Sequence, residues 1–380
     1  MLPAIFGVLR AVRPILRLGN TYLVTRHDDV REIFADDLSF GVPYREKLDR
    51  IMGGAPFILG LPDGCPYRAD LAALRQVMPF SDAPILGARV EKIASGMINS
   101  AAGRIDVVNL VRRVSFEYLS EYLGIPQPEQ GDLPTWSTRL FEYQFVANDK
   151  ALCDEVDRIA PALRAHIGRT IAARHGQPVR DDVLGRCQAM QTTGANGIDD
   201  AWICTALTGM IVGGPPQPPM VVPQAIEQLL RRPYALAAAQ AAARRDDDCE
   251  LAAHLAEAMR FDPLAPWMPR VALRPRTIGE RRHARAIPAG ARVLASMASA
   301  MRDHRRVPDP GQFDAGRSAD QYLHFGWGVH QCFGLELNRA TLHLMVKPLL
   351  QRRNLRRAPG RAGRLVRQGV FASSLEVEFD

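Results

Sequence analysis

One cysteine near the C-terminal end of the chain lies in a glycine-rich loop whose pattern suits a metal ligand. The loop spans residues 325–334 and reads Phe-Gly-Trp-Gly-Val-His-Gln-Cys-Phe-Gly. Gly326 and Gly328 can take the positive φ angles that let a backbone lie flat under a planar group, and Gly334 lets the chain turn straight into a helix. At a helix N-terminus the free N–H groups stabilise a thiolate over a thiol. The pattern therefore predicts Cys332 as the thiolate ligand of a macrocycle-bound iron.

The same residues resemble the cysteine loop of the cytochrome P450 family, in which Phe-Gly-x-Gly-x-His-x-Cys-x-Gly is followed by x-x-Leu-Ala-Arg. Asn338 stands where the alanine is usual. The resemblance implies a mainly α fold with a minor β-sheet, and a haem b between the long central helix and the helix after the cysteine loop. It also implies that Phe325, His330 and Gly334 contact the haem that Cys332 binds. The alternative is a buried structural cysteine in a Gly-rich turn.

The central helix is expected over residues 199–212, after a turn at 194–197, because this stretch has the length and apolarity of a helix that crosses the fold. It runs into Gly-Gly-Pro-Pro-Gln-Pro-Pro over residues 213–219. Four prolines in these last five positions remove backbone donors and clash with the preceding turn, so the helix should break there.

Aligned with the family's central helix, this break replaces two side chains that normally handle protons. Gly213 and Gly214 align with the family's Ala-Gly, Pro216 with its acid and Gln217 with its threonine. In the family the last two carry protons and position water during oxygen activation. Neither residue here can deliver a proton at ordinary pH. We therefore take these four residues as the candidate catalytic stretch.

Three functions stay open at this point. The protein could be an electron-fed monooxygenase in which water or the substrate relays protons. It could use hydrogen peroxide or an organic hydroperoxide, as a peroxygenase or isomerase, and need no redox partner, although residues 213–219 lack the arginine that peroxide-using relatives often have. It could also be a haem- or ligand-binding protein with little turnover. The first two imply an oxidoreductase acting on a small or medium apolar organic molecule.

The resemblance also implies which side chains reach the haem propionates. The spacing after Glu257-Ala258-Met259-Arg260, a family Glu-x-x-Arg pair, makes Arg270 a strand arginine that binds a propionate. Near residue 67 the family has a histidine and an arginine four residues later. Here Tyr67 takes the histidine position, and Arg75 or Arg68 could supply the charge.

Other family motifs set the expected frame. The arginine that would join the Glu257–Arg260 pair is replaced by Gln312, for which Arg317 or Arg302 could substitute. Residues 287–293 resemble a hairpin, residues 371–379 read as one strand, and the helix after the cysteine loop is expected to continue to residue 345, with a proline at 348.

The composition suits one large domain over residues 1–380, with 47% hydrophobic residues. No apolar run is long enough to span a membrane. Six scattered cysteines, with no Cys-x-x-Cys pair or secretory signal, favour a soluble cytoplasmic protein. The net charge of +7 comes mostly from arginine. One basic cluster could dock an acidic partner such as a ferredoxin or flavodoxin, and it comprises Arg352, Arg353, Arg356, Arg357, Arg361, Arg364 and Arg367. Without interleaved aromatics it does not indicate nucleic-acid binding.

Overall fold

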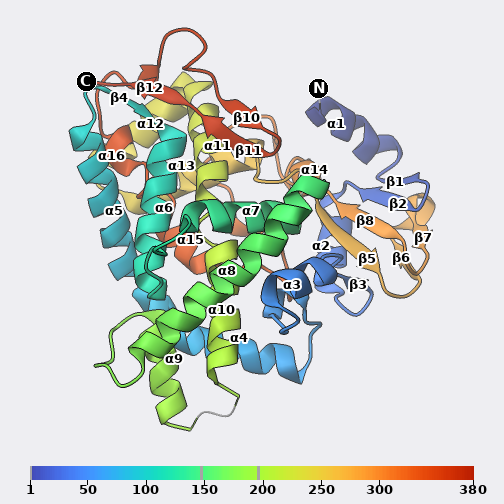
Figure 1. The fold of residues 1–380 in the computed structure, drawn as a ribbon. Coiled ribbons are helices and arrows are strands. Elements are labelled where there is room, and N and C mark those ends of the chain that lie inside the picture. The colour runs from blue at the N-terminus through green and yellow to red at the C-terminus, as the bar shows by residue number, and fades with distance from the viewer. Residues whose placement is uncertain (1, 146–148, 195–196) are drawn as a thin grey trace. The chain divides into compact units, whose positions relative to one another are not determined.

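The computed structural model describes residues 2–145, 149–194 and 197–380 (Figure 1). The fold is mainly helical with small sheets, as predicted. The turn expected at 194–197 lies partly outside the described residues. Among the described residues, no helix combines the length and apolarity that a membrane span requires.

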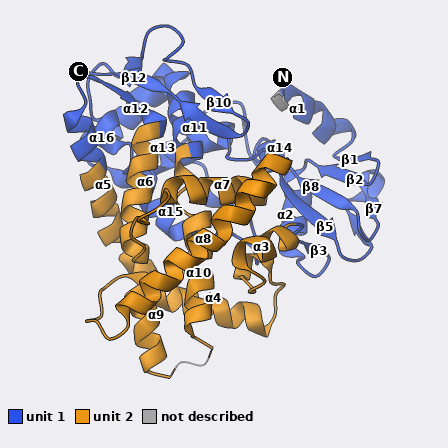
Figure 2. Ribbon diagram, in the orientation of Figure 1, with its two compact units in different colours: residues 1–43, 94–108, 220–380 blue, residues 44–93, 109–219 orange. Residues whose placement is uncertain are grey.

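The chain divides into two compact units, each built from segments that are far apart in the sequence (Figure 2). Unit 1 comprises residues 1–43, 94–108 and 220–380, and unit 2 comprises residues 44–93 and 109–219. A single domain over residues 1–380 stays a prediction. Helices α5 (Ala83–Ser100) and α6 (Val107–Leu123) have residues in both units.

Unit 2 is helical. Its helices are α3 (Arg45–Met52), α4 (Cys65–Val77), α7 (Leu133–Phe145), α8 (Lys150–Arg174), α9 (Val183–Thr192) and α10 (Asp200–Gly213), with 3₁₀ turns η1 (Ile58–Gly60) and η2 (Phe80–Asp82). Aspartates fix several helix starts, because Asp149, Asp182 and Asp199 each accept a hydrogen bond from the backbone N–H three residues later. Helix α10, the predicted central helix, packs against α3, α7, α8 and α9.

Unit 1 contains a five-stranded sheet in the order β1 (Ile15–Leu18), β2 (Thr21–Val24), β8 (Arg292–Ala295), β5 (Met268–Ala272) and β3 (Phe40–Gly41). Strands β2 and β8 are parallel and the other pairs are antiparallel. Helix α2 (His27–Ala35) buries Val30, Ile33 and Phe34, which lie on one helical face, in the same core as Val24 and Val293.

The remaining helices of unit 1 are short or lie in its C-terminal part. They are α1 (Leu2–Val12), α11 (Pro218–Leu230, whose first two residues belong to unit 2), α12 (Pro233–Arg244), α13 (Asp248–Phe261), α14 (Met297–Ala300), α15 (Leu335–Thr341) and α16 (Lys347–Leu350), with 3₁₀ turns η3 (Arg281–His283) and η4 (Ala319–Gln321). The prediction of one helix from the cysteine loop to residue 345 is wrong, because α15 ends at Thr341. Pro348 lies in the first turn of α16 and offers no N–H to the Leu344 carbonyl, which a continuous helix would need.

The predicted hairpin over residues 287–293 is also wrong. Strand β7 (Arg285–Ile287) pairs with β6 (Arg276–Ile278), whereas β8 belongs to the five-stranded sheet. The turn between them is tied to the end of β5 instead, since the Gly290 N–H donates to the Ala272 carbonyl at 2.7 Å. Gly290 has a φ of +77°, which lets the chain pass from one sheet to the other.

The C-terminal segment forms two strands rather than the predicted single one. Strand β11 (Phe371–Ser374) pairs with β10 (Val366–Gln368), and β12 (Glu376–Glu378) lies between β4 (Arg104–Asp106) and β9 (Arg356–Arg357). Buried Leu375 separates β11 from β12. Its N–H donates to the Asp106 side chain at 3.1 Å, and its carbonyl accepts from Val107 at 2.9 Å. These bonds satisfy the backbone where the chain changes sheet.

Candidate functional site

The cysteine loop in unit 1 has the conformation that its glycines predict. Gly326 and Gly328 both have a φ of +74°. The Cys332 N–H donates to the Phe325 carbonyl at 2.9 Å and closes the loop. Gly334 caps α15, and Cys332 lies two residues before that cap. The backbone therefore holds the cysteine at the entrance of a helix, as expected.

Helix α2 and the turn after it hold this loop in place. Trp327 packs against the unit 1 core, and the Arg31 guanidinium lies 3.8 Å from the centre of its ring. A side chain at position 328 would come within 2.5 Å of the Phe34 carbonyl oxygen, so only glycine fits there. The His330 Nε2 lies 2.9 Å from Asp37 Oδ1. This support could not be predicted from the sequence, because nothing in residues 31–37 marks them as partners of a loop 300 residues later.

Cys332 offers one thiolate ligand, which fits an iron that is already held by a macrocycle. Among the described residues, no three His, Cys, Asp or Glu side chains gather as a metal site. A single thiolate is a protein ligand that haem iron can take. The residues present thus fit a haem.

Arg270, the predicted propionate ligand, is buried on β5. Its guanidinium lies 5.0 Å from the centre of the Phe34 ring and donates to the Pro269 carbonyl at 3.0 Å. Phe34 also contributes the carbonyl that Gly328 approaches, so α2 brings Arg270 and the cysteine loop against the same residue. A buried arginine beside this loop could hold a carboxylate.

Tyr67 and Arg75 lie on α4 in unit 2. Tyr67 is buried, and the half-buried Arg75 places its guanidinium 4.4 Å from the centre of the Phe80 ring. Arg68, the alternative to Arg75, is exposed and makes two hydrogen bonds of 2.9 Å to Asp63. That surface pair leaves Arg75 as the better candidate on this helix. A propionate contact from α4 stays a prediction.

The predicted break in the central helix is confirmed. Helix α10 ends at Gly213, and α11 begins at Pro218. In a continuous helix, residues 215, 216, 218 and 219 would donate N–H groups to the carbonyls four residues earlier, and proline has none to give. The sequence therefore deprives the carbonyls of residues 211, 212, 214 and 215 of their usual partners.

Gln217 and Ser115 supply hydrogen-bond donors to some of these carbonyls. The Gln217 side-chain nitrogen donates to the Gly213 carbonyl, while the Gln217 backbone N–H donates to the Gly214 carbonyl at 3.3 Å. The buried Ser115 hydroxyl of α6 donates to the Pro215 carbonyl at 2.9 Å. Gln217 thus uses its side-chain amide to bond the carbonyl at the end of α10. The sequence predicted the same residue to belong to the catalytic stretch. Ser115 was missed, because a serine in an apolar helix carries no signal of its distant partner.

Phe57, just before η1, lies against α10 at Gly209. A side chain on Gly209 would overlap the Phe57 ring, so the glycine in mid-helix makes room for an aromatic ring. This contact could not be predicted from the sequence either, because a lone glycine in an apolar helix does not show what fills the space beside it.

The buried Glu257–Arg260 pair of α13 is confirmed, and Arg317 completes it. Arg260 makes two hydrogen bonds to Glu257, at 2.8 and 2.7 Å, and both side chains are fully buried. The Arg317 Nε lies 3.2 Å from Glu257, so of the two predicted substitutes Arg317 takes the role. Arg302 instead donates to the Phe261 carbonyl.

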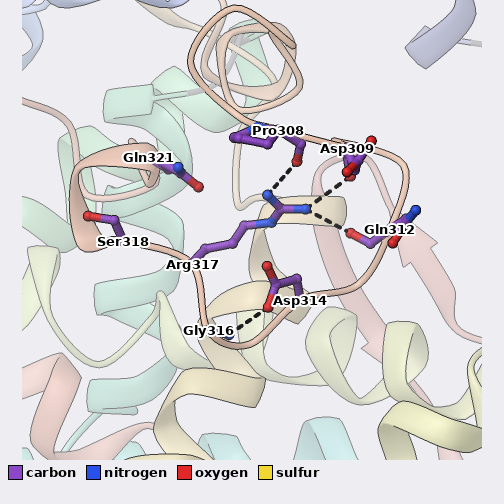
Figure 3. Close-up of a pocket in the computed structure, with 8 residues that line it drawn as sticks. All are labelled: Pro308, Asp309, Gln312, Asp314, Gly316, Arg317, Ser318 and Gln321. Carbon is purple, nitrogen blue, oxygen red and sulfur yellow. Dashed lines mark hydrogen bonds between the residues drawn. The ribbon is translucent and has the colours of Figure 1, made fainter.

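A pocket of about 250 Å³ surrounds Arg317 (Figure 3). The arginine reaches across it and donates to the backbone carbonyls of Pro308, Asp309 and Gln312. Asp314 accepts from the Gly316 N–H at 2.9 Å. Because Arg317 is already engaged by three backbone carbonyls and by Glu257, we assign the pocket to the frame of unit 1 and not to a ligand.

His324 and Tyr322 precede the cysteine loop in a buried environment. Burial lowers the pKa of His324 to about 4, so its ring is neutral near pH 7. The His324 and Phe325 rings lie edge to face with centroids 4.9 Å apart. Burial, together with the Glu257 carboxylate, raises the pKa of Tyr322, whose hydroxyl donates to Glu257 at 3.2 Å.

Several arginines of the C-terminal basic cluster already have partners within unit 1. Arg357 pairs with Glu227 and Arg367 with Asp262, while Arg352 donates to the Asn99 side chain. Arg356 lies 3.2 Å from Glu378. These contacts engage part of the positive charge that the sequence predicted to be available to an acidic partner.

Comparison with known proteins shows which family the chain resembles. Residues 251–370 match the family model described as Cytochrome P450. This C-terminal part of the chain therefore resembles the cytochrome P450 family, and relatives similar along most of the chain include proteins named as hydroxylases. The family implies a haem.

The relatives are similar along almost the whole chain. The chain is 27% identical to the mycinamicin IV hydroxylase/epoxidase of Micromonospora griseorubida, over 91% of this chain and 87% of that protein. It is 24% identical to the erythromycin C-12 hydroxylase of Saccharopolyspora erythraea, over 91% and 85%. Among solved structures, the ligand-free cytochrome P450 TbtJ1 superposes with a TM-score of 0.84 at 25% identity, over 100% of this chain and 97% of that one.

Proposed function

We propose that this protein is a haem-thiolate monooxygenase that oxidises a small or medium apolar organic molecule with dioxygen and electrons from a ferredoxin or flavodoxin. Cys332 would bind haem b, and the bound haem would supply the iron at which oxygen is activated. The observation that carries the proposal is the closed cysteine loop, which presents one sulfur at the entrance of α15.

Other residues would seat the cofactor. The positive charge of Arg270 suits a propionate, and His330, held by Asp37, would stiffen the loop around the sulfur. Tyr67 and Arg75 of α4 are the further candidates for propionate contacts. Phe325 and Gly334 would contact the macrocycle. Each of these roles follows from the family motif and from the position of the residue in its own unit.

Proton delivery would depart from the family's usual route. Pro216 carries no proton, and the Gln217 side-chain nitrogen is engaged with the Gly213 carbonyl. Neither residue can therefore act as a general acid. The protons would have to be carried by water or by a hydroxyl of the substrate. The water would bind at the carbonyls that the prolines leave without backbone donors. The expected consequence is that part of the electron supply is lost to peroxide.

The names of the relatives support the reaction type. One is a hydroxylase/epoxidase and another is a C-12 hydroxylase, and both names denote insertion of one oxygen atom into an organic molecule. We extend that reaction, but not those substrates, to this chain.

A second candidate function is peroxide-driven oxidation, which would need no redox partner. The loss of both proton-handling side chains at residues 216 and 217 favours it. The absence of an arginine at residues 213–219 counts against the version in which an arginine holds a substrate carboxylate.

The test compares an electron-fed system with hydrogen peroxide on the same purified protein. Reduced protein is first given carbon monoxide, and we expect the absorption band typical of sulfur-ligated haem. A panel of apolar substrates is then supplied either with a surrogate ferredoxin, its reductase and NADPH, or with hydrogen peroxide. Product with the electron-fed system supports the monooxygenase. Product with peroxide alone supports the second candidate, and no product in either case indicates a binding protein with little turnover.

A double variant tests the proton argument. Replacing Pro216→Glu and Gln217→Thr restores the family's acid and alcohol. We expect a larger share of the electrons to appear in product and less in peroxide, measured as product formed per NADPH consumed. Unchanged coupling, in a variant whose carbon monoxide spectrum matches that of the parent, would contradict the proposed role of these residues.

A further inference from the structure

Asn338 brings an amide group close to the cysteine sulfur. Its Nδ2 lies 4.0 Å from Cys332 Sγ and 2.9 Å from the Gly334 carbonyl oxygen. Asn338 is on α15, one helical turn after Gly334. All three residues belong to unit 1. The family motif has alanine at this position, so this donor is a feature of the present chain.

The hydrogen bond to Gly334 fixes which way the amide faces. A carbonyl oxygen can only accept, so the atom of Asn338 beside it must be the amide nitrogen. That nitrogen carries two hydrogens. One is used by the Gly334 carbonyl, and the other is available to the sulfur.

Gly334 provides the room for this arrangement. A Cβ at position 334 would lie 3.2 Å from the Asn338 Nδ2 and 3.9 Å from the Cys332 Sγ, and would crowd the amide nitrogen. The φ of Gly334 is −81°, which other residues adopt readily. The need for glycine here is therefore one of space, because a side chain would push the amide away from the sulfur.

We propose that Asn338 is a positioning residue that donates an N–H to the Cys332 thiolate and weakens its donation of electrons to the haem iron. This inference rests on the proposed haem-thiolate function. Hydrogen bonds to a ligand sulfur withdraw charge from it and favour the more electron-rich ferrous state. The chain would therefore have a more easily reduced iron than it would have with alanine at position 338.

Two substitutions separate the contact with sulfur from the contact with Gly334. Asn338→Ala removes both. Asn338→Ser removes the donor near the sulfur but keeps a hydroxyl that can bond the carbonyl four residues earlier, as Thr341 does with the Leu337 carbonyl at 2.8 Å in the same helix. If Asn338 acted only by capping Gly334, the serine variant would behave as the parent.

The control is Thr341→Ala. It removes a side-chain hydrogen bond of the same kind from the same helix, one turn further from the sulfur. The readouts are the ferric–ferrous midpoint potential, the iron–sulfur stretching frequency and the carbon monoxide spectrum of the haem-loaded protein. None of them needs a substrate.

We expect the alanine and serine variants to shift alike, to a lower midpoint potential and a higher iron–sulfur frequency, with Thr341→Ala unchanged. Gly334→Ala should shift in the same direction, because its new methyl group would displace the amide. A serine variant with the potential of the parent, or no shift in either Asn338 variant, would overturn the inference. If the parent itself lacks the sulfur-type carbon monoxide band, the haem-thiolate function fails and the role of Asn338 fails with it.

Discussion

The imidazole of His330 lies against the carboxylate of Asp37, with Nε2 and Oδ1 2.9 Å apart and each side chain only 5% exposed. Asp37 follows α2, and His330 lies two residues before the cysteine. The pair therefore links the turn after α2 to the part of the cysteine loop that directly precedes Cys332. Buried charge-assisted pairs of this kind restrict movement, because breaking one leaves the other group without its partner.

Asp37→Ala should loosen the loop and its haem. Losing a charge-assisted hydrogen bond costs about 1.5–3 kcal/mol, so haem transfer to excess apomyoglobin should be faster by on the order of tenfold or more. The matched control is Asp28→Asn, which removes an exposed carboxylate of α2 that pairs with Arg306 at 2.8 Å. Equal transfer rates in both variants would show that the Asp37–His330 pair does not hold the loop.

Removing the buried side chain of Arg317 should destabilise the protein. Its side chain is 3% exposed and it contacts Glu257, which has no exposure. Removing one partner of a buried ion pair costs about 3–5 kcal/mol, so Arg317→Ala should lower the free energy of unfolding by roughly that amount in urea denaturation. Arg317→Lys should recover only part, since one ammonium cannot serve the carbonyls that the guanidinium reaches.

Arg68→Ala is the comparison for Arg317, because it removes an exposed pair with Asp63. Its unfolding midpoint should stay within experimental error of the parent. A parent-like midpoint for Arg317→Ala as well would mean that Arg317 does not complete the buried cluster.

The sequence predicted the parts of the site that local pattern determines. The glycines of the cysteine loop require particular φ angles, and the prolines after Gly213 remove particular N–H groups, so both conformations follow from a few adjacent residues. Glu257 and Arg260 are likewise only one helical turn apart, so their pairing follows from local spacing.

What the sequence did not predict depends on residues that are far apart. Asp37 reaches His330, and Ser115 reaches Pro215, only because the fold brings their elements together. The single strand predicted for residues 371–379 failed for the same reason. The side chain of Asp106, on another strand, binds the backbone at Leu375 where the chain changes sheet.

His324 should make stability fall in mild acid. Its pKa is lowered to about 4 by burial, whereas an unfolded histidine has a pKa near 6.5. The folded state thus binds fewer protons than the unfolded state between these values, so the contribution is complete above about pH 6.5 and is lost as the pH falls toward about 4. The total is on the order of 3 kcal/mol.

His324→Phe removes this dependence and keeps an aromatic ring beside Phe325. Urea denaturation at pH 5.0 and 7.5 should show a smaller difference between the two pH values in this variant than in the parent. His304→Gln, at an exposed histidine, should retain the difference seen in the parent. A pH dependence in His324→Phe equal to that of the parent would place the acid sensitivity elsewhere.

The two serines of α6 offer a matched test of the central-helix break. Ser115 donates its hydroxyl to the Pro215 carbonyl, which Pro219 leaves without the usual backbone donor. The Ser120 hydroxyl, five residues later in the same helix, is buried and makes no hydrogen bond within the part of the chain that the structure describes. Ser115→Ala should therefore leave a buried carbonyl without its partner, at a cost of about 1–3 kcal/mol in the free energy of unfolding.

Ser120→Ala removes the same atom from the same helix without breaking a bond, so it should be neutral or slightly stabilising. The difference between the two variants isolates the Ser115–Pro215 bond from the effect of serine on helix propensity. If the break after Gly213 shapes oxygen activation, Ser115→Ala should also change the product formed per NADPH consumed, while Ser120→Ala should not. Equal unfolding free energies for the two variants would show that the broken helix end does not depend on α6, and water would then have to satisfy the Pro215 carbonyl.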